Sequence, residues 1–234
     1  MPWLHINQGI VMIVLFAGEK GGAGKSTLAV LTAIERARAG RRVVLVDADT
    51  QATATKWLAR RQREKITPQV PTMQLFERGR GVADDLESAM ATLVKDFEDI
   101  VIDTGGRDSA EMRRALAFAQ VAVFPLRPTM NDLDTAHPMD AVTGRIMAKA
   151  NPNLRTFFTV TQAPSNPFRG SVTGDAKDFL SDCGNIVTGA TVIYSRAAYE
   201  RATIEGRSVS ELDPPDNKAA REIADFLTEV FHDQ

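Results

Sequence analysis

The sequence predicts an α/β fold with a mostly parallel central sheet and helices on both faces. Apolar, β-branched runs recur along the 234 residues and alternate with helical stretches, the pattern of a parallel sheet that is buried on both sides. Hydrophobic residues make up 44% of the chain and charged residues 25%, a balance that provides a buried core. We expect a single domain over residues 1–234. Residues 1–11 are either an N-terminal extension or a segment ahead of an alternative start at Met12.

The predicted elements alternate in chain order. The first strand leads through a glycine-rich turn into a helix rich in Ala, Leu and Arg, and Gly40 ends this helix as a glycine beyond the last turn commonly does. The apolar runs predict strands at 11–17, 42–47, 99–103, 121–125, 156–161 and 189–193. The intervening stretches predict helices at 26–39, 53–65, 82–95, 110–118, 133–149 (in spite of Pro138), 171–182 and 217–231.

Composition excludes several classes of protein. The net charge of −2 gives no overall attraction to nucleic acid, so any DNA binding requires a local basic patch. Cys183 is the only cysteine, which excludes an intramolecular disulfide, a CxxC redox pair and an all-cysteine metal site. No apolar run approaches the ~20 residues that span a bilayer, and residues 1–9 lack the basic start of a secretory signal. We therefore expect a cytoplasmic protein.

The stretch GEKGGAGKST, residues 18–27, follows the first strand directly. A strand that runs through a glycine-rich turn into a helix directs backbone N–H groups at a phosphate, and the helix N-terminus adds partial positive charge. In the pattern G-x-x-x-x-G-K-[ST], Lys25 reaches the terminal phosphates and the Ser26 hydroxyl ligates Mg²⁺. Glu19 occupies the first glycine position, so the strict pattern fails by one residue. The alternative is a glycine-rich turn without a ligand.

Carboxylates follow two of the predicted strands. Asp47 and Asp49 come after the apolar run 43–46, and Asp103 ends the strand 99–103. The carboxyl ends of strands are where open α/β sheets bind ligands. Aspartates also end strands as turn residues or helix caps, and this alternative stays open for each of the three.

The segment from Lys20 to Ser26, KGGAGKS, resembles the deviant Walker A loop of the ParA/MinD family of ATPases. This resemblance implies a P-loop NTPase fold with ATP and Mg²⁺ as cofactors. It also implies that Lys20 is a signature lysine, which reaches across a nucleotide-sandwich dimer to the partner's phosphates and acts in catalysis together with Lys25 and Asp49. The other reading of Lys20 is a solvated lysine beside the loop. The implied nucleotide-binding residues are Gly21, Gly22, Ala23, Gly24, Lys25, Ser26, Thr27 and Gln162.

The carboxylates resemble family motifs as well. Residues 47–51, DADTQ, are similar to the D-x-D-P-Q motif, with Thr50 in place of proline. Carried over, Asp49 orients or activates the attacking water, Asp47 supports Mg²⁺ through water, and Asp103 is the outer-sphere Mg²⁺ carboxylate beside Ser26. The glycines that follow Asp103 stand where many relatives have a proline pair, and we expect them to form a switch region that senses the γ-phosphate.

For Gln162, the resemblance implies contact with the adenine base. A loop amide that is hydrogen-bonded to backbone is the alternative.

The resemblance extends from Val11 to Phe231 and is greatest to the short ParA plasmid-partition proteins. It implies an ATP-dependent homodimer that binds DNA without sequence preference, is reset by hydrolysis, and works with a centromere-binding, ParB-like adaptor in plasmid maintenance, in association with the nucleoid. Arg196 and Arg201 are the candidate DNA contacts. A second basic cluster on the helix 53–65, with Arg61 at its centre, is more simply interpreted as a solvated helix face.

Other members of the family bind membranes or different cargoes. The last predicted helix has an acidic polar face, which anionic lipid would repel, so we expect it to pack on the sheet and expect no membrane partner. A positioning ATPase of the MipZ type or one associated with conjugation remains an alternative. An ATP-dependent biosynthetic ligase of the dethiobiotin synthetase type is a further one, against which Lys20 and the D-x-D-x-Q stretch argue.

Overall fold

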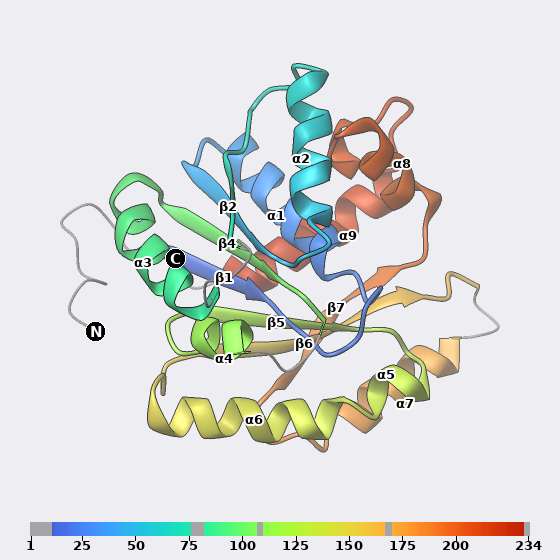
Figure 1. Cartoon of the computed structure of the whole chain (residues 1–234). Coiled ribbons are helices and arrows are strands. Elements are labelled where there is room, and N and C mark those ends of the chain that lie inside the picture. The colour runs from blue at the N-terminus through green and yellow to red at the C-terminus, as the bar shows by residue number, and fades with distance from the viewer. Residues whose placement is uncertain (1–10, 76–81, 107–109, 167–169, 232–234) are drawn as a thin grey trace.

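The computed structural model describes residues 11–75, 82–106, 110–166 and 170–231, and these form a parallel sheet with helices on both faces (Figure 1). The strands are β1 (Met12–Phe16), β2 (Val43–Ala48), β3 (Thr72–Gln74), β4 (Asp99–Thr104), β5 (Val121–Leu126), β6 (Arg155–Ala163) and β7 (Val187–Tyr194). Within the described residues, these seven strands form one sheet in the order β3-β2-β4-β1-β5-β6-β7, and every neighbouring pair is parallel. The predicted fold class is therefore confirmed.

The helices follow the predicted alternation. They are α1 (Lys25–Arg38), α2 (Thr53–Arg63), α3 (Val82–Asp96), α4 (Ala110–Leu116), α5 (Met130–Leu133), α6 (Ala136–Lys149), α7 (Gly170–Leu180), α8 (Ala197–Glu205) and α9 (Asn217–Phe231), with a short 3₁₀ helix η2 (Val209–Glu211). In the ranges described, no helix combines the length and the apolarity that crossing a membrane requires.

The prediction of one helix over residues 133–149 is wrong. α5 ends at Leu133 and α6 begins at Ala136, so that Pro138 lies in the first turn of α6. A proline there costs no helical hydrogen bond, because the first N–H groups of a helix have no partner within it. Strand β3 and helix α8 were not predicted; β3 has only three residues and is half-exposed at the sheet edge.

Two apolar layers enclose the sheet, and β1 contributes to both. Ile13 and Leu15 pack with the buried side chains of α3, α4, α6 and α7, whereas Met12, Val14 and Phe16 pack with those of α1, α2, α8 and α9. All five are buried because β1 lies between β4 and β5 in the middle of the sheet. Successive side chains of a strand point to opposite faces, so a strand covered on both sides is apolar throughout.

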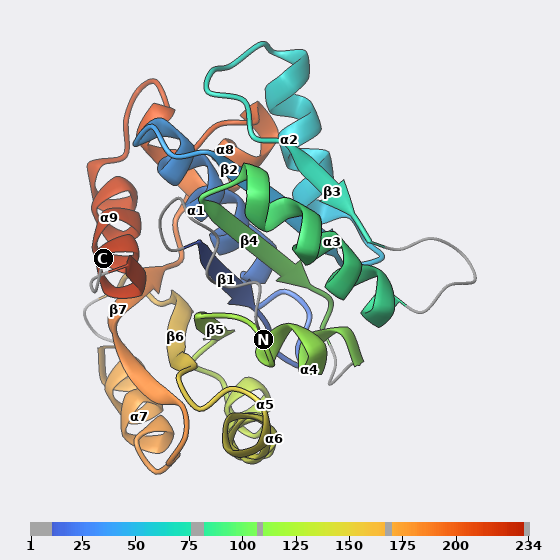
Figure 2. The same cartoon turned by 90° about the vertical axis from the view of Figure 1, so that its left-hand side faces the viewer.

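Helix α9 packs along β7, the strand at one edge of the sheet (Figure 2). Its apolar residues Ile223 and Val230 are buried, which confirms that it packs on the sheet. Two of its glutamates, which the sequence places on a polar face, also contact β7. Glu229 accepts the N–H groups of Ala190 at 2.6 Å and Thr191 at 3.0 Å, and Glu222 accepts that of Tyr194 at 3.2 Å. These carboxylates satisfy backbone donors that an edge strand would otherwise expose.

Candidate nucleotide site

The glycine-rich loop connects the central strand β1 to helix α1. Gly22 and Gly24 have φ angles of 77° and 93°, in the left-handed region that residues with a Cβ rarely adopt. These two positions let the loop curl tightly before α1 begins at Lys25, one residue earlier than predicted. Ala23, between them, is buried. The loop thus ends at the N-terminus of a helix of 14 residues, where backbone N–H groups favour an anion.

A pocket of about 290 Å³ lies over this loop. Besides the loop, its wall includes the end of β6, residues between β2 and the start of α2, and Gly106 after β4. The lining residues are Gly21, Gly22, Gly24, Lys25, Ser26, Thr27, Asp49, Gln51, Thr53, Gly106 and Gln162. The carboxyl ends of β1, β2, β4 and β6 meet here, as expected for a ligand site in a parallel sheet.

Lys25 is buried, and its Nζ donates a hydrogen bond of 2.7 Å to the backbone carbonyl of Lys20. Burial lowers the pKa of Lys25, whereas the charges of Asp103, Asp49 and Asp132 raise it. The Lys20 side chain is half-buried, and only its carbonyl takes part in this bond. An anion in the pocket would therefore meet an ammonium group that carboxylates already surround.

Asp103 is fully buried at the end of β4, and neither of its carboxylate oxygens accepts a hydrogen bond of ordinary geometry from a described residue. Its pKa is raised to about 8: burial is the main cause and the charge of Asp47 adds to it, whereas the nearby Ser26 hydroxyl and Lys25 act in the opposite direction. A cation beside Asp103 would stabilise its charged form. The unpartnered oxygens next to the Ser26 hydroxyl fit the Mg²⁺ that accompanies a bound nucleotide phosphate. In the described parts of the chain, no three His, Cys, Asp or Glu side chains form a metal site on their own.

Asp47 and Asp49 occupy different surroundings. Asp49 is half-buried and lines the pocket, where its Oδ1 accepts the Gln51 N–H at 2.9 Å. Asp47 is fully buried and does not line the pocket: Oδ1 accepts the Asp49 N–H at 3.1 Å, and Oδ2 accepts the N–H and hydroxyl of Thr55 at 2.9 and 2.7 Å. Both oxygens of Asp47 thus hold the turn between β2 and α2, and the expected support of Mg²⁺ through water stays a prediction.

Gln162 lies at the pocket, but its amide is bonded to the loop. Its Nε2 donates a hydrogen bond of 2.5 Å to the Gly22 carbonyl, and the neighbouring Thr161 hydroxyl donates one of 2.7 Å to the Ala23 carbonyl. The alternative of an amide bonded to backbone is therefore what the structure contains. Thr161 was not predicted, although its position at the carboxyl end of β6 is the same signal that identified Asp103 on β4.

Gly106 is the second residue that the sequence did not single out individually. A Cβ added there would lie 3.0 Å from the Glu19 carbonyl oxygen and 3.1 Å from both the Gly21 nitrogen and the Lys20 carbonyl carbon. These are all backbone atoms, so only glycine lets the segment after β4 approach the loop this closely. The expected switch segment thus rests directly on the main chain of Lys20.

The candidate DNA contacts are engaged within the protein. Arg196 donates from Nε to Glu222 at 2.7 Å, and its side chain is 17% exposed. Arg201 donates to Glu205 at 2.8 Å and to the Pro214 carbonyl at 3.0 Å. Neither guanidinium is a free cation. The sequence could not reveal this, because Glu222 approaches Arg196 only when α9 packs on β7.

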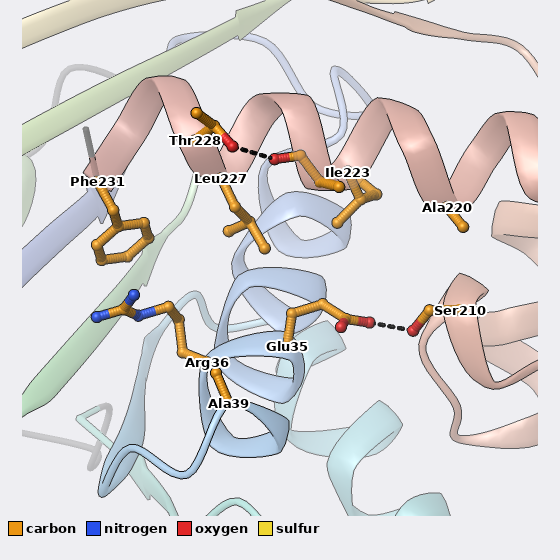
Figure 3. A pocket seen from close by; sticks show the side chains of 10 residues that line it. Glu35, Arg36, Ala39, Ser210, Ala220, Ile223, Leu227, Thr228 and Phe231 are labelled. Carbon is orange, nitrogen blue, oxygen red and sulfur yellow. Dashed lines mark hydrogen bonds between the residues drawn. The ribbon is translucent and has the colours of Figure 1, made fainter.

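A further pocket, of about 520 Å³, lies between the C-terminal half of α1 and α9 (Figure 3). Its one basic side chain among the described lining residues, Arg36, is bonded to Asp99 at 2.6 Å and lies 4.0 Å from the centre of the Phe231 ring. At the other end, Glu35 accepts a hydrogen bond from Ser210. Most of the remaining lining residues are apolar side chains of α9. The pocket lies at the end of α1 opposite the glycine-rich loop, and the described residues that line it all differ from those that line the nucleotide site.

A parallel sheet whose central strand runs through a glycine-rich loop into a helix, with buried acids on the neighbouring strands, defines a P-loop NTPase fold. Comparison with known proteins then identifies the family. The family model of the ATPase MipZ matches residues 12–154, which is more than half of the chain and includes the loop and all three aspartates. The chain belongs to this family, within the ParA/MinD group of deviant Walker ATPases.

Individual relatives agree with this assignment. The chain is 31% identical to protein ParA of Rhizobium radiobacter over 51% of its own length and 50% of that protein's length, so the match spans about half of that relative. It is 28% identical to the maintenance of carboxysome distribution protein A of Halothiobacillus neapolitanus over 92% of this chain and 94% of the other. A plasmid partition protein of Borrelia burgdorferi, solved with AMPPNP, has the same fold, with a TM-score of 0.71, 18% identity, and coverage of 95% and 98%.

Proposed function

We propose that this protein is a Mg²⁺-dependent ATPase that forms an ATP-sandwich homodimer, binds DNA without sequence preference in that state, and is reset by hydrolysis. The observation that carries the proposal is the loop from Lys20 to Ser26. It curls between β1 and α1 beneath a pocket, with a buried lysine at its base and Asp49 on its wall. Membership of a family of ATPases supports ATP as the nucleotide.

The roles of the individual residues follow from their surroundings. Lys25 and the N–H groups of the loop would bind the phosphates, and Asp49 would orient the attacking water. Ser26 would ligate Mg²⁺ and Asp103 would hold a water of its coordination shell. When bound, the metal neutralises phosphate charge. Lys20 would complete the site of the partner chain, so that hydrolysis depends on dimerisation.

DNA binding requires a local basic surface, because the net charge of the chain is −2. The best-supported candidate is a pocket at the carboxyl ends of β6 and β7, where Lys177, Arg196 and Lys218 line the same hollow of about 690 Å³. Arg196 is neutralised by Glu222, and the Lys177 ammonium donates to the Ala190 carbonyl at 2.7 Å. Lys218 is exposed and is the residue of the three that we expect to contribute most to phosphate contact.

The proposal is tested by measuring binding to a random DNA duplex without nucleotide and with ADP, ATP or a non-hydrolysable ATP analogue, each at several salt concentrations. Binding that appears only with a triphosphate and weakens steeply with salt is the expected result. Lys218→Ala should reduce the slope of log affinity against log salt by about one in each chain. Lys149→Ala, an exposed lysine at the far end of α6, should leave the slope unchanged.

The cargo is a separate question, and two candidates remain. Plasmid DNA carried through a centromere-bound, ParB-like adaptor is the first. The second is a positioning ATPase for a protein cargo, favoured by the match over 92% of the chain to a carboxysome distribution protein and by the MipZ family model. Stimulation of ATP hydrolysis by an adaptor bound to centromere DNA would support the first. ATPase activity without DNA binding in any nucleotide state would overturn the DNA step and favour the second.

A further inference from the structure

The end of β6 is bonded to the phosphate loop at two successive residues. The Thr161 hydroxyl, which is buried, donates to the Ala23 carbonyl at 2.7 Å, and the Gln162 amide donates to the Gly22 carbonyl at 2.5 Å. A Cβ at Gly24 would lie 3.8 Å from Thr161, so the loop also packs against this side chain at ordinary contact distance. Both bonds join residues about 140 positions apart in the chain.

These two hydrogen bonds fix the direction of backbone N–H groups in the loop that could bind an anion. In a planar trans peptide, the carbonyl and the following N–H point in opposite directions. The Gly22 carbonyl shares a peptide plane with the Ala23 N–H, and the Ala23 carbonyl shares one with the Gly24 N–H. Because β6 holds both carbonyls, the N–H groups of Ala23 and Gly24 are turned away from β6 and remain available to a phosphate.

The backbone of β6 changes conformation to reach the loop. Gln162 has a φ angle of 50°, in the left-handed region that is uncommon for a residue with a Cβ. The register between β6 and β7 shifts between Val160 and Ala163, the segment that contains Gln162. Such departures persist where surrounding contacts over-determine them, and they cluster at ligand sites. The irregularity turns the Gln162 side chain onto the loop.

We propose that Thr161 and Gln162 are positioning residues of the phosphate loop: they orient the Ala23 and Gly24 N–H groups for the nucleotide phosphates through the carbonyls of Gly22 and Ala23. The inference rests on the loop's proposed role in ATP binding. It assigns Gln162 to the phosphate end of the nucleotide and not to recognition of the base.

Thr161→Val tests the first contact, since it keeps the branched shape and removes the hydroxyl. We expect the dissociation constants for ADP and ATP to rise about three- to tenfold, the effect of one lost hydrogen bond. Thr161→Ser should restore affinity. Thr156→Val is the matched control: it lies on the same strand, is also buried, and loses a hydroxyl bond of 2.6 Å to the Asn185 carbonyl, away from the loop. It should bind nucleotide normally even if both valine variants melt at a lower temperature.

Gln162→Ala tests the second contact, at an exposed position where loss of folding is not expected. If Gln162 holds the loop, its loss should weaken ATP binding and GTP binding by the same factor, again about three- to tenfold. A changed ratio of ATP to GTP affinity would instead assign Gln162 to base recognition and overturn its positioning role. Thr161→Val with unaltered affinity, or equal losses in Thr161→Val and Thr156→Val, would overturn the role of Thr161. Failure of the unaltered protein to bind ATP would overturn the proposed function itself.

Discussion

The side-chain ammonium of Lys25 donates a 2.7 Å hydrogen bond to the main-chain carbonyl of Lys20. The two lysines of the loop are therefore connected through the backbone of one and the side chain of the other. Any residue at position 20 supplies the same carbonyl, so the Lys20 side chain can be altered without removing the acceptor for Lys25. Substitution of the Lys20 side chain therefore tests the proposed role of Lys20 across the dimer without removing the hydrogen bond that holds Lys25.

Lys25→Ala should abolish ATP binding, because it removes the buried cation at the base of the pocket and leaves Asp103 and Asp49 without their neighbouring positive charge. Titration calorimetry measures the affinity directly. Lys149→Ala, which removes an exposed lysine outside the pocket, is the control and should bind ATP as the unaltered protein does. Unchanged affinity in Lys25→Ala would remove the assignment of the loop.

Lys20→Ala should still bind ATP as a monomer, since the bond to Lys25 uses the carbonyl at position 20 and not the side chain. It should lose the ATP-dependent dimer, because the proposed contact with the partner's phosphates is gone. Light scattering with and without ATP distinguishes the two states. A dimer that persists in this variant would refute the role of Lys20 across the interface.

Asp49→Ala should bind ATP but hydrolyse it about a hundredfold more slowly, because the residue lines the pocket where the attacking water would be oriented. The ATP-bound dimer should then accumulate. Asp49→Asn is the informative companion: it keeps an oxygen for the Gln51 N–H, which Asp49 Oδ1 accepts at 2.9 Å, but loses the charge. Equal slowing in both variants assigns the effect to the carboxylate, whereas normal turnover in either would contradict the proposed role.

Gly106→Ala should disturb the loop, because the added Cβ would lie 3.0–3.1 Å from backbone atoms of Glu19, Lys20 and Gly21. Backbone cannot yield as a flexible side chain does, so we expect weaker nucleotide binding and less ATP-dependent dimer. Gly174→Ala is the control: it lies in α7, no atom of a described residue is within 4 Å of its Cβ position, and it gains helix propensity. Gly106→Ala with normal nucleotide affinity and dimerisation would show that the contact is not needed.

Arg61→Met should destabilise the fold by about 3–5 kcal/mol, the usual cost of removing one partner of a buried ion pair. The Arg61 side chain is fully buried and pairs with both carboxylate oxygens of Glu211, at 2.7 and 2.9 Å. Arg63→Met, on the same helix, removes an exposed side chain that pairs with Glu64 and should change the unfolding free energy by about 0.5 kcal/mol or less. Urea unfolding measures both variants, and an equal effect in the two would contradict the prediction.

The ion pair of Arg61 with Glu211 should also make the unfolding free energy depend on pH. Burial would raise the pKa of Glu211, but hydrogen bonds from Arg61 and the Ser208 N–H, together with the charge of Arg61, lower it overall. A carboxyl group with a lowered folded-state pKa contributes stability that is present above its unfolded pKa of about 4.3 and is lost as the pH falls through the folded value. The difference in unfolding free energy between Arg61→Met and the unaltered protein should therefore shrink below about pH 4. A difference in unfolding free energy that grows in acid would contradict this prediction.

The sequence alone determined the fold class and the place of the glycine-rich loop between a strand and a helix. The loop is contiguous, and local backbone geometry brings its glycines, Lys25 and Ser26 together, so their spacing in the sequence carries the information. The buried strands were equally readable, because β1, β2, β4 and β5 are apolar on both faces. Asp49 and Asp103 could be anticipated close to each other, since the carboxyl ends of parallel strands lie on the same side of the sheet. The hydrogen bonds from Thr55 to Asp47 could not be anticipated, because Thr55 lies on the helix that follows.

Only the tertiary structure decided which charged and polar side chains have partners. Arg61 reads as part of a solvated basic helix, yet it is buried against Glu211, 150 positions away. Arg196 reads as a free cation, but α9 brings Glu222 to it. For Gln162 the sequence left a base contact and a backbone bond both open, and the irregular end of β6 places its amide on the Gly22 carbonyl. Hydrophobic periodicity specifies which face of an element is buried, whereas a hydrogen bond or ion pair depends on ångström-scale placement of segments far apart in the chain, which no local pattern encodes.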